Sequence, residues 1–269
     1  MNQVLLKQMK SIELQEEKFL NPKENLLFKE KVAPVLDKIQ DKIPEKLAST
    51  LETAFFKGFQ LVFEKGNTYI EKTYNKEQKL LDYDVNNYAI DKKLCNRFIN
   101  KLDRSSLYSN AINSSVSIVE GGLLGMLGIG LPDIPLFIAL IMKTVYEVSL
   151  SYGHDYETDE TKGYILLLIR SALAKGDLQK TLNEQTDKLG YQLDHKEAIT
   201  VDLDEEMQLT SKALSDTLLT AKFIQGIPVV GAVGGLINYN IVQKVSQYSK
   251  IKFKKRYLLK KSEISTDVM

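Results

Sequence analysis

The sequence predicts an all-α protein, a multi-helix bundle with two central glycine-rich helical hairpins. Three observations favour this fold class. Apolar residues recur three and four positions apart in several segments, which is the period of an amphipathic helix. No segment shows the sustained alternation of apolar and polar residues that indicates a strand. Glycine and proline concentrate in two segments with almost no charge, which interrupt an otherwise ordinary helical pattern.

The first part of the chain predicts an arm followed by a folded domain. Residues 1–34 are charged, weakly patterned and interrupted by proline, so we expect a helical or partly disordered arm with limited burial. From residue 35 the apolar spacing becomes regular, and a helix is expected to begin at Pro44, where proline is tolerated. Another helix over 85–101 is expected to turn Tyr88 toward the core.

The later part of the chain continues the same domain. Helices are expected over about 162–174 and 204–221, with a polar stretch between them. We place the helical domain at residues 35–258 and treat residues 259–269 as a basic and polar tail.

The two glycine-rich segments each contain small residues four positions apart, which share one face of a helix. Glycine at such positions lets a second backbone approach closely. We therefore expect the two helices to cross on their glycine faces. The glycines expected at this crossing are Gly121, Gly125, Gly128, Gly231 and Gly235.

Three interpretations of these segments remain open: a pair of buried helices in a soluble protein, an element that contacts a membrane, and a phosphate-binding loop. The window over 124–142 is apolar enough to cross a bilayer, but Asp133 and two prolines lie within it, where a charge is costly. A phosphate loop is the weakest interpretation, because no glycine here is followed by the Lys-Ser/Thr that such a loop requires.

The helical end from Lys244 to Lys261 carries eight basic residues and no acidic one. It follows the uncharged segment 223–243, and basic clusters beside apolar segments suit the anionic inner leaflet of a membrane. The alternative is a solvated helix whose lysines keep the protein soluble. The side chains expected to face a membrane are Lys250, Lys252, Lys254, Lys255 and Arg256.

Composition limits the classes of function. The formal net charge is +1, so the chain lacks the positive field typical of nucleic-acid-binding proteins. Cys95 is the only cysteine, which excludes an intrachain disulfide, and two histidines are too few for a histidine-rich metal site. The first residues mix short apolar pairs with charges, so no secretory signal is expected. We expect a cytoplasmic protein with no cofactor and no resident metal.

One candidate polar cluster combines the glycine-rich segments with the loop after the apolar helix. Carboxylate and amide oxygens suit magnesium or calcium, so a hydrolase or metal-dependent site is one interpretation. In the other interpretation Gly153 ends a helix and the residues after it form a turn. The cluster comprises Glu120, Asp133, His154, Asp155, Asn238 and Tyr239.

Several motifs together resemble the EcsC family over roughly residues 35–256. In chain order they are Lys42-Ile-Pro-Glu-Lys-Leu, Glu120-Gly-Gly, Leu131-Pro-Asp-Ile-Pro, Tyr152-Gly-His-Asp and Ile227-Pro-Val-Val-Gly-Ala-Val-Gly-Gly. The resemblance implies a helical bacterial protein of unassigned molecular function, and it contributes no catalytic residue. Many members of the family carry an aromatic or another side chain where this sequence has His154.

The family takes its name from a gene set that also encodes an ABC transporter. We therefore expect a non-enzymatic accessory or interaction protein, peripheral to the inner face of the membrane. Its expected partners are an anionic membrane surface or a membrane transporter. The alternatives are a metal-dependent or other hydrolase that uses Asp133, Glu120 and His154, and a lipid-binding module that uses the apolar hairpins.

Overall fold

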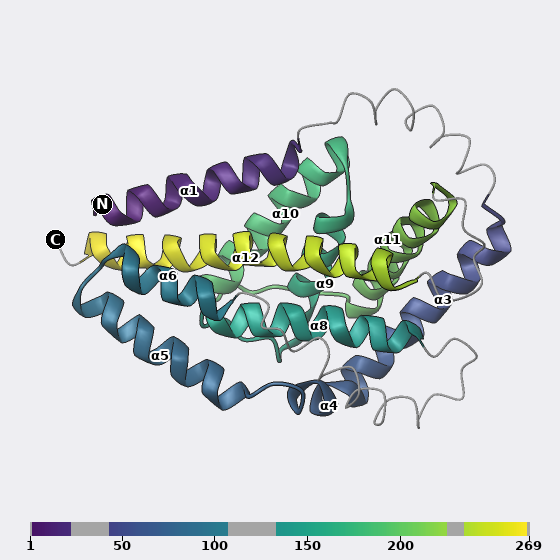
Figure 1. Ribbon diagram of the computed structural model, residues 1–269, viewed down its shortest axis with the longest axis horizontal. Coiled ribbons are helices and arrows are strands. Elements are labelled where there is room, and N and C mark those ends of the chain that lie inside the picture. Colours follow the sequence, from purple (N-terminus) through teal and green to yellow (C-terminus); the bar gives the residue numbers. More distant parts are fainter. Residues whose placement is uncertain (1, 23–42, 107–132, 225–233, 268–269) are drawn as a thin grey trace.

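The computed structural model describes residues 2–22, 43–106, 133–224 and 234–267, and within these ranges it is all-helical, without a strand. Figure 1 shows the longest helix, α12, running along most of the molecule, with α1 and α8 packed beside it. The elements are α1 (Gln3–Leu20), α3 (Glu45–Leu61), a π-helix η1 (Val62–Gly66), α4 (Asn67–Glu71), α5 (Lys76–Lys92), α6 (Asn96–Ser105), α8 (Asp133–Ser151), α9 (Asp159–Leu173), α10 (Gly176–Asp194), α11 (Leu203–Ile224) and α12 (Gly234–Asp267).

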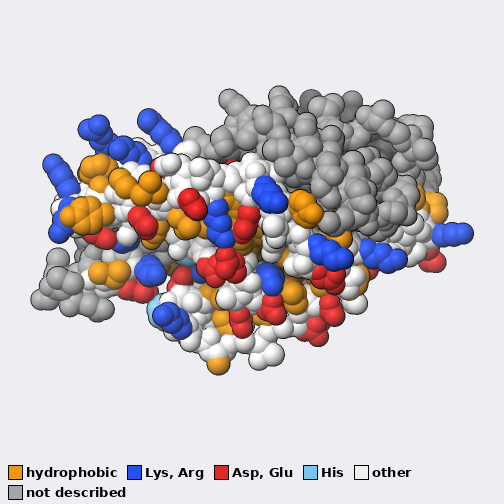
Figure 2. All heavy atoms as spheres, turned by 90° about the horizontal axis from the view of Figure 1, so that it is seen from below, with side chains coloured by type: hydrophobic (Ala, Val, Ile, Leu, Met, Phe, Trp, Pro, Cys, Tyr) orange, Lys and Arg blue, Asp and Glu red, His pale blue; other side chains and the backbone are white. Residues whose placement is uncertain are grey.

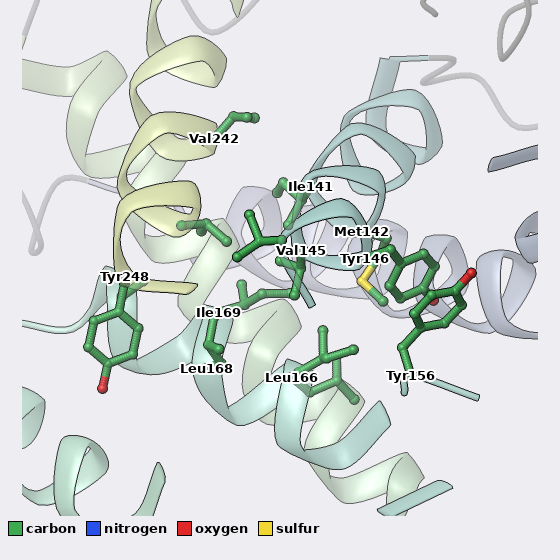
Figure 3. Close-up of a cluster of buried hydrophobic side chains, with 14 of the residues drawn as sticks. Ile141, Met142, Val145, Tyr146, Tyr156, Leu166, Leu168, Ile169, Val242 and Tyr248 are labelled. Atoms are coloured by element: carbon green, nitrogen blue, oxygen red, sulfur yellow. The ribbon is translucent and has the colours of Figure 1, made fainter. Parts of the chain in front are cut away.

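Helix α8 lies at the centre of the fold and packs against α3, α5 and α12. Figure 3 shows Val145 and Tyr146 of this helix among buried side chains that also come from α9 and α12. Among the described residues, α8 is the one helix long and apolar enough to cross a membrane, yet 89% of its window Ile134–Ser151 is buried. A helix that is apolar on all sides also suits a core position, so burial by its neighbours accounts for its composition.

Local signals explain where α8 ends and α9 begins. Gly153 adopts φ +74°, and the His154 N–H donates to the Ser149 carbonyl, which closes the end of α8. A Cβ atom at Gly153 would also lie 2.1 Å from Cζ of Tyr83, so no side chain fits there. Thr158 then caps α9 by accepting a hydrogen bond from the backbone N–H of Thr161. The interpretation of this segment as a helix end and turn is confirmed.

The N-terminal segment contributes to the core. Helix α1 packs along α12, and Leu5 and Ile12 are buried between them. The expected helix is present, and the face that carries Leu5, Ile12 and Glu16 is buried. The domain boundary expected after residue 34 lies outside the described residues. At the second expected boundary, after residue 258, helix α12 continues without a break.

Two helical predictions need correction. The helix expected over 85–101 is interrupted between α5 and α6, and Tyr88, expected to face inward, is 64% exposed. The polar stretch after α9 contains the complete helix α10. Its periodicity is weak because polar side chains fill much of its buried face, among them Gln179, Asn183 and Thr186.

The glycine-rich hairpins fall almost entirely outside the described residues. This applies to Gly121, Gly125, Gly128 and Gly231, whereas Gly235 lies in the first turn of α12. Their expected crossing remains a prediction.

Candidate functional site

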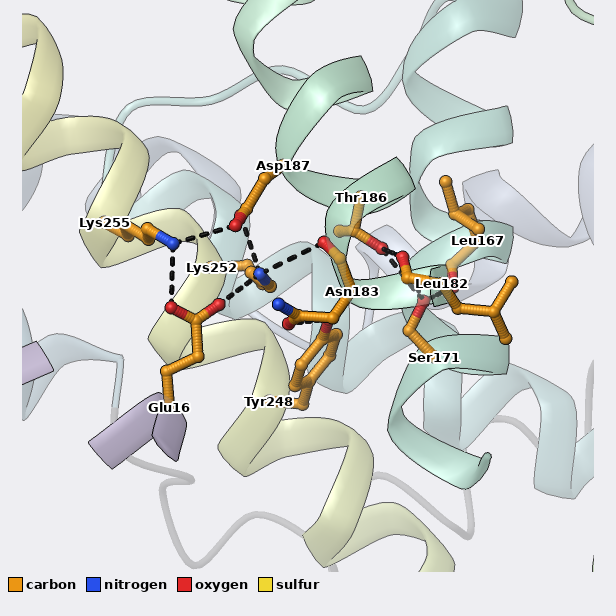
Figure 4. A network of polar contacts seen from close by, with 10 residues as sticks. All are labelled: Glu16, Leu167, Ser171, Leu182, Asn183, Thr186, Asp187, Tyr248, Lys252 and Lys255. Atoms are coloured by element: carbon orange, nitrogen blue, oxygen red, sulfur yellow. Dashed lines mark hydrogen bonds and ion pairs between the residues drawn. The ribbon is translucent and has the colours of Figure 1, made fainter. Parts of the chain in front are cut away.

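Helix α12 directs several basic side chains into the molecule. Four of the charged groups around it form what we call the α12 ion-pair cluster: Glu16 from α1, Asp187 from α10, and Lys252 and Lys255 from α12 (Figure 4). Lys252, whose side chain is 1% exposed, pairs with Glu16 and lies 2.6 Å from Oδ1 of Asp187. Lys255 donates to the same two carboxylates, at 2.7 and 2.8 Å. The cluster therefore joins three helices.

Mutual neutralisation makes this burial possible. Burial opposes the charged form of Glu16, but Lys252 and Lys255 outweigh it and lower the pKa of this carboxyl. Burial is the main reason that the pKa of Lys252 lies below its usual value, although the two carboxylates oppose this shift. Two carboxylates balance two ammonium groups. Without that balance, each buried ion would cost several kcal/mol.

Neutral hydrogen bonds extend the cluster toward α9. The Tyr248 hydroxyl donates to Oδ1 of Asn183 at 2.8 Å, next to Lys252 (Figure 4). On the far side of α10, the hydroxyl groups of Ser171 and Thr186 lie 2.9 Å apart, and each hydroxyl oxygen is also 2.7 Å from a backbone carbonyl oxygen of its own helix. These polar groups bind one another, which is the arrangement that a stable packed interior requires.

A second buried ion pair lies one helical turn further along. Arg256 donates through Nε and Nη2 to the two carboxylate oxygens of Asp194, both at 2.8 Å. Its guanidinium group covers the ring of Tyr164 at 4.6 Å from the centroid. Gly190 makes room for this arrangement, because a Cβ atom there would lie only 3.0 Å from Cδ of Arg256. Burial alone would raise the pKa of Asp194, but the contacts with Arg256 outweigh burial, and the pKa of this carboxyl is lowered.

His154 lies directly behind this pair. Its Nδ1 atom is 3.7 Å from Oδ1 of Asp194, and its ring contacts Phe253. Burial and the nearby Arg256 lower the pKa of His154 to about 3, so the imidazole is neutral at pH 7. Its Nε2 atom is buried and has no hydrogen-bond partner among the described residues.

A third pair connects α12 to α6. Lys254 donates to Oδ2 of Asp103 at 2.8 Å, and the Tyr152 hydroxyl donates to Oδ1 of the same carboxylate at 2.8 Å. Lys250 donates to the backbone carbonyl of Asp103 at 3.3 Å. Asp103 therefore ties the end of α6 to both α12 and the end of α8.

These contacts correct the prediction that the basic residues of α12 face a membrane. Lys252 and Lys254 are buried, and Lys255 and Arg256 are mostly buried in ion pairs. Lys250 is half-buried. Acidic partners neutralise the charges of Lys252, Lys254, Lys255 and Arg256, so these four side chains do not form a free basic surface.

The candidate polar cluster is not assembled as expected. Asp133 begins α8 and His154 follows its end, and 19 helical residues separate these ends by about 28 Å. Asp133 and His154 therefore cannot share one catalytic centre. Asp155 accepts hydrogen bonds from the backbone N–H groups of the next two residues, and Tyr239 is 50% exposed. Glu120 and the side chains of Asp133 and Asn238 lie outside the described residues.

Acidic residues, histidines and cysteine do not converge elsewhere in the described ranges: no group of three or more that could hold a metal ion occurs there.

A pocket of about 300 Å³ opens between α10 and the C-terminal part of α12, and we call it the α10–α12 pocket. Its floor includes the Arg256–Asp194 pair, and Tyr191 and Leu259 contribute exposed apolar surface. The lining residues are Asp187, Lys188, Tyr191, Asp194, His195, Lys255, Arg256, Leu259, Lys260 and Glu263.

The second notable surface, which we call the hairpin surface, lies on α5, α6 and the turn between them. Figure 2 shows hydrophobic side chains beside Lys and Arg side chains at the left end of this face, where Figure 1 places α5 and α6. Its exposed apolar residues are Leu81, Val85 and Tyr88, and its exposed basic residues are Lys92, Lys93, Arg97, Lys101 and Arg104.

Sequence reasoning missed the acidic partners on α10, although a signal was present. Asn183, Asp187, Gly190 and Asp194 recur at steps of three and four residues, so they share one helix face. Lys252 and Arg256 repeat the same spacing on α12. Two faces of opposite charge with helical spacing indicate an interhelical ion-pair seam.

The fold and these seams define an all-helical protein whose buried polar groups hold its last helix in place. The chain belongs to the EcsC protein family, whose model matches residues 6–258. It is similar to Protein EcsC of Bacillus subtilis (strain 168), with 23% identity over 230 residues, which cover 83% of this chain and 84% of that protein. No solved structure shows a significant match. The match begins at Leu6 and so includes most of α1, for which the motifs indicated no counterpart.

Proposed function

We propose that this protein is a non-enzymatic accessory protein that binds peripherally to an anionic membrane surface on the cytoplasmic side. The observation that carries the proposal is the hairpin surface. It combines exposed apolar side chains with basic side chains that have no acidic partner within the described residues. A helix of a soluble domain normally turns such an apolar stripe toward the core.

The apolar part of the hairpin surface is a continuous stripe on α5. Leu81, Val85 and Tyr88 follow at steps of four and three residues and are 55%, 58% and 64% exposed. Lys92 continues the stripe, with its ammonium group 5.3 Å from the centroid of the Tyr88 ring. Tyrosine beside lysine, next to aliphatic side chains, is a combination that suits the interface between water and lipid headgroups.

The basic part of the surface lies mainly on α6. Arg97, Lys101 and Arg104 follow at steps of four and three residues, so they share one exposed face, and Lys93 precedes them in the turn. Each basic residue near an anionic leaflet contributes about 1 kcal/mol to binding. Together with Lys92, the surface has five basic residues and three apolar anchors, which support reversible binding, not permanent insertion.

The interior supports a binding role over a catalytic one. The buried basic groups of Lys252, Lys254 and Arg256 are each paired with a carboxylate, and these pairs connect helices of the fold. A membrane-bound position would also bring the protein beside a membrane transporter, the partner that the family resemblance implies.

Sedimentation with lipid vesicles tests this function. The full chain is expected to bind vesicles of phosphatidylcholine with phosphatidylglycerol, and not vesicles of phosphatidylcholine alone, because the basic residues require an anionic surface. Added salt should release it. The double variant Arg97→Gln/Lys101→Gln should weaken binding by about 2 kcal/mol, roughly 30-fold.

Matched variants separate this surface from general effects of charge or hydrophobicity. Lys180→Gln/Lys212→Gln removes two exposed lysines from other helices and should leave binding unchanged. Val85→Ser/Tyr88→Ser should reduce binding, whereas Leu178→Ser, at a 62% exposed position on α10, should not. Equal binding to neutral vesicles, or full binding by the hairpin variants, would contradict the proposal.

A further inference from the structure

We propose that the α10–α12 pocket binds a small phosphate monoester that carries a planar ring, a ligand of the size of a nucleoside monophosphate. The pocket has no residue in common with the hairpin surface, so this inference is independent of the membrane proposal. A volume of about 300 Å³ lies at the lower end of the range for small-molecule sites.

The floor of the pocket consists of side chains that are paired with one another or with their neighbours. Arg256 is held on both sides, by the paired oxygens of Asp194 and by the ring of Tyr164, and Gly190 admits it between the helices. Asp187 is likewise occupied by Lys255. The two floor carboxylates are thus neutralised by their own partners and do not repel an anion at close range.

Two positive charges at the rim remain available to a ligand. Lys188 on α10 and Lys260 on α12 are exposed, and neither has an ion pair or hydrogen bond in the described part of the chain. Lys260 is close enough to Asp194 to help lower the pKa of that carboxyl. Lysine ammonium groups bind phosphate as point charges. Glu263, the remaining lining acid, lies 3.5 Å from Nε2 of His195.

An aromatic wall stands beside these lysines. Tyr191 is 52% exposed, and its ring is stacked on that of His195, with the centroids 3.9 Å apart. Stacking on an exposed aromatic ring favours a ligand with a planar ring of its own, and it is tolerant of the identity of that ring. Phosphate recognition at the rim and stacking on the wall together define the proposed ligand class.

Isothermal titration of the full chain tests the proposal, with AMP and UMP as probes. Binding should be saturable for at least one nucleotide, and adenosine, uridine and inorganic phosphate should each bind at least tenfold more weakly. Lys188→Gln/Lys260→Gln and Tyr191→Ser should each weaken nucleotide binding at least tenfold. Lys180→Gln, another exposed lysine of α10, should bind as the unaltered chain does.

Three outcomes would overturn the assignment. They are no saturable binding of either nucleotide, unchanged binding by both pocket variants, and phosphate alone binding as tightly as the nucleotides. The altered side chains are all exposed at the rim or wall, so these variants should fold. Helical circular dichroism verifies this before each titration.

Discussion

Lys252 is the residue at which charge and burial conflict most directly. Its side chain is 1% exposed, and its two acidic partners come from helices far away in the sequence. Removing one member of a buried ion pair leaves the other charge unpaired, and this loss costs more than the pair contributes. The residue therefore reports how strongly the fold depends on the α12 ion-pair cluster.

We expect Lys252→Met to lower the free energy of unfolding by about 3 kcal/mol, because Glu16 and Asp187 then share only Lys255. Urea unfolding followed by circular dichroism measures this change. Lys212→Met, at an exposed pair, should cost at most about 0.5 kcal/mol. The double variant Glu16→Leu/Lys252→Met should cost less than the sum of its single variants. Additive costs would show that the two side chains do not interact.

His154 gives the fold a dependence on pH. Burial and Arg256 lower its pKa from 6.5 to about 3, although Asp194 opposes the shift. Between these two values the unfolded chain binds a proton that the folded chain does not bind. Stability is therefore fully present above pH 6.5 and decreases as pH falls toward 3.

Between pH 6.5 and about 3, the free energy of unfolding is expected to decrease by up to about 1.4 kcal/mol for each unit by which the pH falls. Urea unfolding at successive pH values measures this slope. His154→Phe should remove it above pH 5, since the aromatic ring fills the same space without titrating. Below about pH 4.5 the carboxyls of Glu16 and Asp194, whose pKa values are lowered, add a further loss. A His154→Phe variant with an unchanged slope would refute the assignment.

At the scale of elements, α1 is the helix whose role changed most between sequence and structure. Its charged composition indicated an arm, yet Leu5 and Ile12 are buried against the core and Glu16 completes an ion pair. The exposed face of the same helix carries Leu14, which is 47% exposed. Ile12 and Leu14 are similar in size but differ in burial, so substitutions at these two positions can be compared directly.

We expect Ile12→Ala to destabilise the protein by about 2 to 4 kcal/mol, through lost burial and the cavity left between α1 and α12. Leu14→Ala should change stability by less than about 0.5 kcal/mol. Thermal or urea unfolding measures both. Equal effects at the two positions would mean that α1 does not pack on α12 in solution.

The apolar periodicity of the sequence predicted helices whose inner faces are apolar, but it did not predict α10, whose inner face is largely polar. The helix expected from Pro44 is α3, and the aliphatic helix expected over 162–174 is α9. Helix α10 was not predicted from the sequence, because Gln179, Asn183 and Thr186 occupy much of its buried face. Since this helix carries Asp187 and Asp194, the candidate site was not predicted either.

At the scale of the whole molecule, near-neutral net charge conceals an uneven distribution. Acidic partners neutralise Lys252, Lys254 and Lys255 of α12 inside the molecule, whereas the basic residues of α6 remain exposed. The surface that would contact an anionic membrane therefore lies on the α5–α6 hairpin, although the C-terminal sequence is more basic.

Fractionation of cells that express the tagged full chain tests this distribution. We expect the protein in the membrane fraction and its release by a high-salt wash, because charge contributes most of the attraction. Arg97→Gln/Lys101→Gln should move it to the cytosol. Release by detergent alone would contradict peripheral binding and would assign the contact to apolar insertion. Recovery of the unaltered protein in the cytosol would remove the membrane proposal.

The sequence by itself determined the helical class, the family and the positions of most helices, because these depend on local periodicity and contiguous motifs. Only the tertiary structure decided which charges are buried. Lys252 meets a carboxylate 236 positions away, and the stripe containing Tyr88 is exposed although its spacing suits a core. Periodicity specifies which residues share a face of a helix. Whether another helix covers that face depends on contacts between distant parts of the chain.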